Sequence, residues 1–375
     1  MTGPRVVGHE CWLHGGIKAR EERYLMPPSR VFINQRSNMY FTIPNTSTLK
    51  NYAAIAFSLL GYTAGIAMLF AENWPINIAG VLLVSESMII SAYLLHEFAH
   101  WSIFKNSQTN QRWGVIMSWI NGSCYSTFQE IRDKHMHHHV DRADVLTFNV
   151  QYLMRDMPVL ARNIIKVLEW FYIPALEILM HLLVIILPFV QPEWHYKRFR
   201  LLLILLVRAP LLILMAWISI KAWLLYLLAY CIMLTALRFA DAFQHTYDVF
   251  LESEIAKNGG KVNDGKLRDR AYEQANTFSN LTSIKYPWLN LLFLNFAYHN
   301  AHHEKPIVPW HELPVFHKKL FGDSVALPVV PMSRLLSAYH RHRVTRLQSD
   351  NYGVLTNESA DAFIGAAGVS FLTAL

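Results

Sequence analysis

Four long apolar segments limit what this chain can fold into. They cover residues 51–70, 76–95, 201–220 and 222–240, and each is about twenty residues long. An α-helix rises about 1.5 Å per residue, so about twenty residues cross a hydrocarbon layer about 30 Å thick. The chain is 53% hydrophobic and only 16% charged, which is typical of an integral membrane protein. We therefore predict an all-α, multi-pass membrane protein with four transmembrane helices.

The short connections between these segments predict two helical hairpins. Residues 71–75 join the first pair, and Lys221 alone separates the second pair. The chain then returns to the same side of the membrane after each hairpin. A fifth apolar segment, residues 172–190, would break this parity if it spanned the membrane. Because prolines interrupt it, we expect an interfacial helix there, and we also expect one in the short segment 113–128.

Lysine and arginine side chains flank the apolar segments and give the chain a net charge of +7. They are Lys18, Arg20, Arg23, Arg30, Arg36 and Lys50 before the first segment, and Lys197, Arg198 and Arg200 before the third. Such flanks mark the cytoplasmic side of membrane helices. The charge therefore needs no nucleic-acid partner. We expect a cytoplasmic segment over residues 1–50, a membrane domain over residues 51–330, and a basic, then apolar, tail over residues 331–375.

Three histidine clusters lie at the ends of the apolar segments or just beyond them. They are His96-Glu97-Phe98-Ala99-His100, His135-Met136-His137-His138-His139 and His299-Asn300-Ala301-His302-His303. Residues at i, i+3 and i+4 share one face of a helix. With 18 histidines in 375 residues, one HxxHH pattern is expected by chance only about 0.04 times. Eight imidazoles on three helical faces predict a site for two transition-metal ions.

Three further residues belong to the candidate site, and a fourth is expected to lie outside it. His245 follows the fourth apolar segment on the predicted metal side, and we expect it to be a ninth ligand. Asp241 lies one helical turn earlier, and it and Glu97 are candidates to orient a ligand. His137 lies off the face that His135, His138 and His139 share, which favours a position outside the ligand set.

Two other interpretations fit parts of this pattern. His96-Glu97-Phe98-Ala99-His100 matches the HExxH motif of zinc proteases, but a protease would leave two HxxHH triplets and His245 unexplained. A metal carrier or transporter would hold ionisable groups near the middle of the bilayer. Here the spans are nearly free of charge, with Arg208 as the main exception.

The order of HxxxH, HxxHH, an apolar hairpin, an isolated histidine and a final HxxHH resembles the membrane-bound fatty acid desaturase superfamily. The third cluster continues into a proline-punctuated stretch, residues 302–314, that is also similar to this family. The resemblance covers about residues 51–314. It implies a four-helix membrane stem and a cytoplasmic cap with two non-haem irons, which use O₂ to remove hydrogen from an acyl chain. The ligand positions that it implies are His96, His100, His135, His138, His139, His245, His299, His302 and His303.

The resemblance leaves the reaction open. Desaturation is the first expectation, followed by oxidative decarboxylation of a free fatty acid to a terminal 1-alkene, and then by hydroxylation. The compact chain, with its HEFAH and HMHHH boxes, is also similar to the bacterial decarboxylating branch. The sequence contains no His-Pro-Gly-Gly haem motif and no CxxC pair. We therefore expect a separate electron donor, ferredoxin- or cytochrome-like, with its reductase. The expected location is a bacterial inner membrane with the active site on the cytoplasmic side.

A long apolar substrate needs a narrow apolar channel that holds one methylene at the metal. A single bulky residue in such a channel would change the chain length that is accepted. The sequence does not indicate which residue this is.

Overall fold

The computed structural model describes residues 45–375, apart from residues 263, 323–327, 350 and 357–358. Most of the expected cytoplasmic segment, up to residue 44, lies outside these described residues. The described residues are mostly helical.

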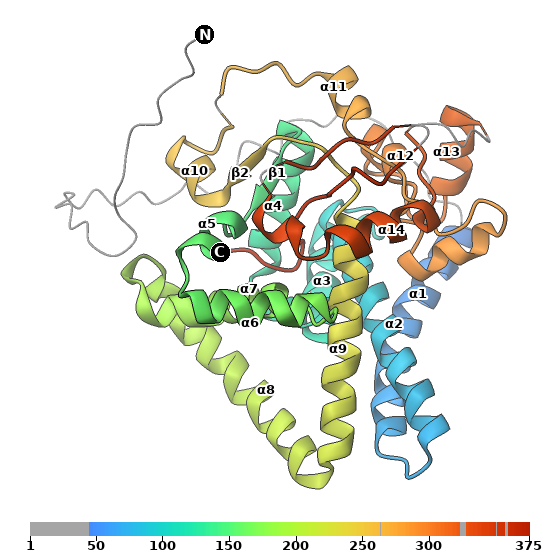
Figure 1. Ribbon diagram of the computed structural model, residues 1–375. Helices are drawn as coiled ribbons and strands as arrows, with labels where there is room; N and C mark the ends of the chain where they lie inside the picture. Colours follow the sequence, from blue (N-terminus) through green and yellow to red (C-terminus); the bar gives the residue numbers. More distant parts are fainter. Residues whose placement is uncertain (1–44, 263, 323–327, 350, 357–358) are drawn as a thin grey trace. The chain divides into compact units, whose positions relative to one another are not determined.

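Four long helices form the membrane stem (Figure 1): α1 (Asn45–Leu69), α2 (Trp74–Ala99), α8 (Arg198–Ile218) and α9 (Ile220–Asp241). Each of the four is long and apolar enough to cross a membrane, so the structure has a candidate membrane-spanning helix at each of the four predicted positions. They begin up to six residues earlier than the apolar segments do, because polar residues such as Thr48 still continue the first helix. No other described helix meets both criteria.

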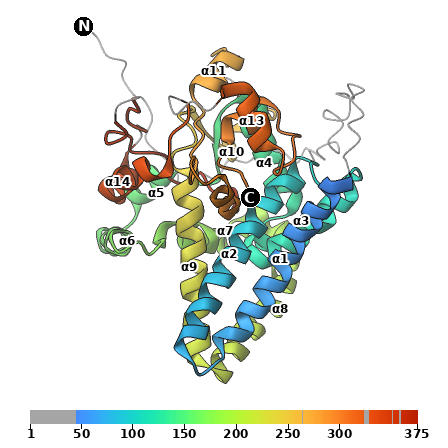
Figure 2. The same cartoon turned by 90° about the vertical axis from the view of Figure 1, so that its right-hand side faces the viewer.

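Small residues allow α1 and α2 to pack closely. A Cβ atom on Gly65 would lie 2.7 Å from Val84 Cγ2, and one on Gly80 would lie 3.1 Å from the Gly65 carbonyl oxygen. Such glycines let two membrane helices approach each other. Figure 2 shows α1 and α2 side by side, with α9 next to them. In the most apolar part of α2, 72% of the residues are buried, so α2 is the central helix of the stem.

The helix α8 has a different environment. Only 11% of its most apolar stretch is buried, and α8 diverges from α9 beyond their junction at Ser219 (Figure 1). An apolar helix that is exposed on nearly all sides suits lipid rather than a protein core. Ser219 makes the short connection possible, because its Oγ accepts a hydrogen bond from the backbone N–H of Ala222 and so caps α9.

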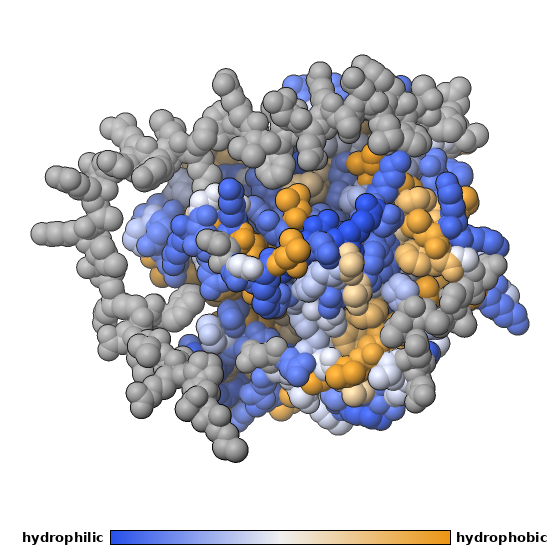
Figure 3. All heavy atoms as spheres, turned by 90° about the horizontal axis from the view of Figure 1, so that it is seen from above, coloured by the Kyte–Doolittle hydropathy of each residue, from blue (hydrophilic) through white to orange (hydrophobic). Residues whose placement is uncertain are grey.

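The remaining elements gather at one end of the stem, and we call them the cap. Its helices are α3 (Ser107–Asn121), α4 (Phe128–Asp141), α5 (Val150–Asp156), α6 (Val159–Trp170), α7 (Ala175–Val190), α10 (Glu252–Lys257), α11 (Arg270–Ala275), α12 (His299–Glu304), α13 (Leu313–Phe321) and α14 (Met332–His342). Four 3₁₀-helices join them: η1 (Ser123–Tyr125), η2 (Pro192–Lys197), η3 (Pro287–Phe293) and η4 (Thr345–Gln348). Seen from above, the part of the cap that is not drawn in grey is largely hydrophilic (Figure 3).

Two short strands depart from the all-α expectation. β1 (Asp144–Leu146) and β2 (Val249–Leu251) pair in parallel, with Asp144 opposite Val249. Each strand has only three residues, which is too few for an alternating apolar pattern to appear in the sequence.

The fifth apolar segment forms α7, which has 16 residues and is shorter than the four stem helices. With α6 it lies across the stem in Figure 1. On α6 the side chains of Val159, Leu160 and Ile164 are exposed, and such an apolar face suits the membrane–water interface. The segment 113–128 is divided by Gly122, which has a φ of +87° and ends α3.

The end of the chain packs into the core. Leu372 and Ala374 are buried in the same apolar cluster as residues of α2 and α9. The tail that we expected over residues 331–375 therefore contributes side chains to the interior of the protein.

Candidate metal centre

Each histidine cluster lies on a different helix. His96 and His100 lie at the end of α2, which stops at Ala99. His135, His138 and His139 lie on α4, which begins at a capping box: Thr127 Oγ1 accepts from the Glu130 N–H at 3.1 Å, and Glu130 Oε2 accepts from the Thr127 N–H at 2.7 Å. This reciprocal cap fixes the start of α4 and therefore the direction in which its histidines point.

The third histidine cluster and the isolated His245 lie on other elements of the fold. His299, His302 and His303 lie on α12. His245 lies four residues after the end of α9, directly after a turn, and forms an isolated β-bridge with Thr277. All four of these side chains are buried.

All nine predicted ligand positions come together in two adjacent groups. The first group is His96, His100, His135, His139 and His302, and the second is His138, His245, His299 and His303. Within each group, one ring nitrogen from each histidine lies within 4.8 Å of all the others. The Nε2 atoms of His100 and His135 are 2.7 Å apart, and those of His245 and His299 are 2.6 Å apart. The rings therefore converge on two common points.

The two groups are neighbours. The rings of His139 and His303, one from each group, have centroids 4.3 Å apart. The arrangement can hold two metal ions side by side, with all ligands supplied by imidazole.

The imidazoles are ready to bind metal because burial keeps them neutral. Burial, reinforced by His303, lowers the pKa of His138 to about 3. Burial, reinforced by Arg142, lowers the pKa of His303 to about 3. Neutral imidazole is the form that binds transition metals. The buried Nε2 atoms of His96 and His303 have no hydrogen-bond partner in the part of the chain that the structure describes. A bound cation would satisfy both atoms.

In the second group, a carboxylate and a backbone carbonyl hold the opposite ring nitrogens of His303 and His138. Glu273 Oε1 lies 3.1 Å from His303 Nδ1, and the carbonyl oxygen of Ala143 lies 2.9 Å from His138 Nδ1. A partner on Nδ1 fixes the ring with Nε2 towards the metal. Sequence reasoning missed Glu273, because it lies on α11, thirty residues before His303, and no spacing rule connects the two.

Glu97 lies beside the first group. Its Oε1 is 3.5 Å from His96 Nδ1. Its Oε2 accepts hydrogen bonds from Ser102 Oγ at 2.7 Å and from the Trp310 N–H at 3.1 Å. Glu97 thus connects the first histidine cluster to the segment after the third. The HExxH interpretation needs this carboxylate to activate water, whereas Glu97 Oε2 already accepts the hydrogen bonds of Ser102 and Trp310.

Asp241 takes a different place from the expected one. It ends α9, and the chain then turns, so His245 is not one helical turn further along the same face. Among the described residues, no hydrogen bond joins Asp241 to a histidine of either group, and Asp241 instead lines a cavity. His137 pairs with Asp141, at 2.7 Å between Nδ1 and Oδ2, and belongs to neither group.

A cavity lies against both groups. His96 and His135 of the first group and His245 and His299 of the second are part of its wall. Its apolar lining comes from α2, β1, α9, the segment between η3 and α12, and residues 369–372: Ala92, Tyr93, Val145, Leu234, Leu237, Phe296, Val369, Phe371 and Leu372. Its polar lining includes Lys134, Glu177, Arg238, Asp241 and Gln244.

A comparison with family models matches residues 72–333, which are 262 of the 375 residues, to the model described as Fatty acid desaturase. The chain belongs to the fatty acid desaturase family. It is therefore an oxidoreductase of fatty acyl chains that works in a lipid membrane. All nine histidines lie inside the region matched to the fatty acid desaturase model, whereas Phe371 and Leu372 lie outside it. A search of the curated proteins found no match.

Proposed function

We propose that this protein is a membrane-bound, O₂-dependent, non-haem di-iron oxidase that desaturates fatty acyl chains. The observation that supports this most strongly is the pair of histidine groups at the wall of one largely apolar cavity. His96, His100, His135, His139 and His302 would hold one iron, and His138, His245, His299 and His303 would hold the other. When bound, two irons supply the reduction of O₂ and the removal of hydrogen from an unactivated C–H bond.

The residues around the cavity would position the substrate and exclude water. Tyr93, Leu234 and Leu237 give an acyl chain an apolar surface. The ring of Phe371 lies 5.5 Å from that of His96 and 5.0 Å from that of His135, so it shields the first group on the cavity side. A dry, closely fitting wall holds one part of the chain at the reacting position.

We also propose that electrons come from a separate ferredoxin- or cytochrome-like protein with its reductase. The site would face the cytoplasm from a bacterial inner membrane. The Lys and Arg residues that flank the spans support this orientation.

Decarboxylation of a free fatty acid to a terminal 1-alkene is the second candidate. Lys134 lines the cavity next to His135 and is buried. Among the described residues it bonds only neutral oxygens: Thr147 Oγ1 and the carbonyls of Ser370 and Thr373. Its charge also interacts with the carboxyl groups of Glu252, Glu177 and Asp241, so a substrate carboxylate near the metal centre would compete with these groups for it.

Product analysis separates the two reactions. Membranes that contain the protein are fed with free fatty acids under reducing conditions, and the products are analysed by gas chromatography. An internal double bond supports desaturation, and a volatile alkene one carbon shorter than the substrate supports decarboxylation. Membranes that yield neither product, although iron is bound, would contradict both candidates.

The ligand assignment has a matched set of variants. His139→Ala and His302→Ala each remove a ring from the first group, so we expect turnover to be abolished while membrane insertion stays intact. His137→Ala is the control, because this ring lies outside both groups. We expect it to keep wild-type iron content, measured by elemental analysis, and wild-type turnover. Full activity in His139→Ala or His302→Ala would contradict the assignment.

A further inference from the structure

A second, smaller cavity lies behind the first. Its lining includes Gly122, Ser126, His181 and Val184. Leu372 lines both cavities, with Phe371 before it in the larger one and Thr373 after it in the smaller one. The C-terminal segment, which we define as residues 369–374, therefore forms the partition between them.

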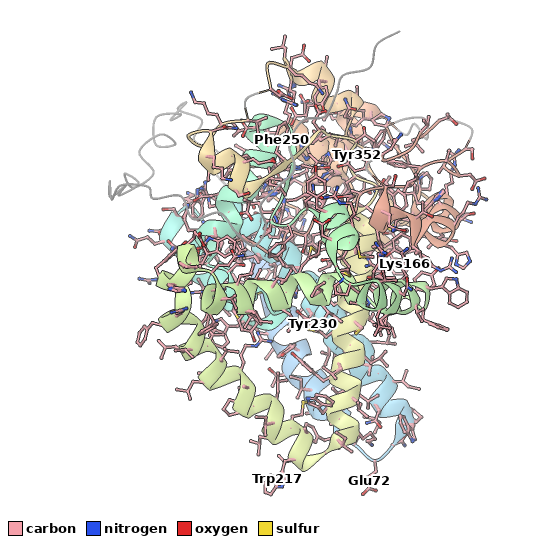
Figure 4. The ribbon with its side chains drawn as sticks, turned by 60° about the vertical axis from the view of Figure 1, so that its left-hand side comes forward. Glu72, Lys166, Trp217, Tyr230, Phe250 and Tyr352 are labelled. Atoms are coloured by element: carbon pink, nitrogen blue, oxygen red, sulfur yellow. The ribbon has the colours of Figure 1, made fainter. Side chains whose placement is uncertain are left out.

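The smaller cavity continues the larger one away from the histidines. Its residue His181 hydrogen-bonds Tyr230, at 2.8 Å between Nδ1 and the phenol oxygen. On α9, Tyr230 lies about one turn before Leu234 and about two turns before Leu237, which line the larger cavity. In Figure 4, Tyr230 lies below Phe250 and Tyr352 of the cap, in the direction of Trp217 and Glu72. The helix α9 therefore lines the larger cavity directly and approaches the smaller one through the hydrogen bond between Tyr230 and His181.

Hydrogen bonds hold the partition on both sides of Leu372. Lys134 Nζ donates to the carbonyl oxygens of Ser370 at 2.7 Å and Thr373 at 2.6 Å. Ser126 Oγ donates to the Ala374 carbonyl at 2.7 Å and accepts from the Ala374 N–H at 3.0 Å. The side chain of Leu372 is only 4% exposed. Hydrogen bonds to Lys134 on α4 and to Ser126 after η1 fix the backbone on both sides of Leu372, and its buried side chain therefore stays between the two cavities.

We propose that Leu372 ends the substrate channel and sets the longest acyl chain that the protein accepts. This inference rests on the proposed function. The reacting part of the chain lies at the histidines, and its methyl end lies against the Leu372 side chain. A longer chain would have to displace Leu372. Shortening this residue connects the cavities and gives a longer chain room for further methylene groups.

Binding of saturated free fatty acids tests the proposal without turnover. Purified protein in detergent is titrated with acids that differ by two carbons, in competition with a fluorescent fatty acid. We expect Leu372→Ala to move the tightest-bound length upward by at least one two-carbon step. Each additional buried methylene should strengthen binding of the longer acids by about fourfold. The products of membranes fed with the same acids should shift in the same direction.

Three further variants make the test specific. Leu335→Ala is the matched control, because Leu335 is equally buried but belongs to a different apolar cluster; its length preference should stay that of the wild type. Adding Val184→Phe to Leu372→Ala refills the smaller cavity from α7 and should restore the original preference. Leu372→Val removes less volume and should give a smaller shift, which can still be measured if Leu372→Ala does not fold.

An unchanged preference in folded Leu372→Ala, or in folded Leu372→Val, would overturn this inference and leave the proposed function standing. A wild-type protein that binds no acid of the series and forms no product would overturn the proposed function itself.

Discussion

Glu273 holds His303 in the orientation that a metal ligand needs. Its Oε1 lies 3.1 Å from His303 Nδ1, and its Oε2 accepts a hydrogen bond from Arg142 Nε at 2.8 Å. Loss of such a partner weakens metal binding about 10- to 100-fold. We therefore expect Glu273→Ala to lower iron affinity by about this factor, measured by titration against a chelator of known affinity.

Glu273→Gln separates orientation from charge. The amide oxygen can still accept a hydrogen bond from His303 Nδ1, so we expect this variant to lose less affinity than Glu273→Ala. Equal iron affinity in Glu273→Ala and in the wild type would show that the contact does not orient the ligand.

For single residues, the sequence indicated the candidate metal ligands better than it indicated the residues that contact them. The nine histidines could be recognised because eight of them repeat at helical spacing and His245 follows a span. Glu273 and Phe371 could not be recognised. The tertiary fold brings each of them next to a histidine that is distant in the sequence, and neither shares a helix with the histidine that it contacts.

Among the elements, a buried ion pair connects α9 to α6. Arg238 Nη2 lies 2.6 Å from Glu169 Oε2, and Glu169 Oε1 also accepts the Leu176 N–H at the start of α7. Removing one partner of a buried pair leaves the other charge uncompensated, at a cost of about 3–5 kcal/mol. We expect Arg238→Met to lower the free energy of unfolding in detergent by about this amount.

The exposed pair of Arg155 and Asp156 provides the comparison. Water screens an exposed pair, so Arg155→Met should leave the free energy of unfolding close to that of the wild type. Similar losses of unfolding free energy in Arg155→Met and Arg238→Met would show that the buried Arg238–Glu169 pair stabilises the protein no more than an exposed pair does.

The C-terminal segment should loosen when its anchor at Ser126 is removed. Ser126→Ala deletes both hydrogen bonds to Ala374, and each is worth about 1 kcal/mol. Together they correspond to about a 30-fold change in an opening equilibrium, so we expect amide hydrogen exchange in residues 369–374, followed by mass spectrometry, to become about 30-fold faster. Ser118→Ala is the control, because Ser118 is also buried but bonds only the Val115 carbonyl within its own helix. Identical exchange in the two variants would contradict this anchoring role.

In the whole molecule, the α1–α2 and α8–α9 connections lie at the end of the stem opposite the cap. Figure 4 shows Glu72 and Trp217 together at the end away from the cap. We expect single cysteines at Glu72 and Trp217, in a chain whose three native cysteines are replaced by serine, to react with an impermeant maleimide from one side of the membrane. A cysteine at the exposed cap residue Lys266 should react only from the other side. Labelling of all three from one side would contradict this topology.

The sequence by itself determined the class of the protein, its four spans and the nine histidines. These depend on local properties: hydrophobic length against membrane thickness, and side-chain spacing along one helix. Only the tertiary structure decided that the histidines form one group of five and one of four, that Asp241 faces the cavity, and that the end of the chain closes that cavity. Those results depend on contacts between residues far apart in sequence, such as Lys134 with Thr373, and no local pattern encodes them.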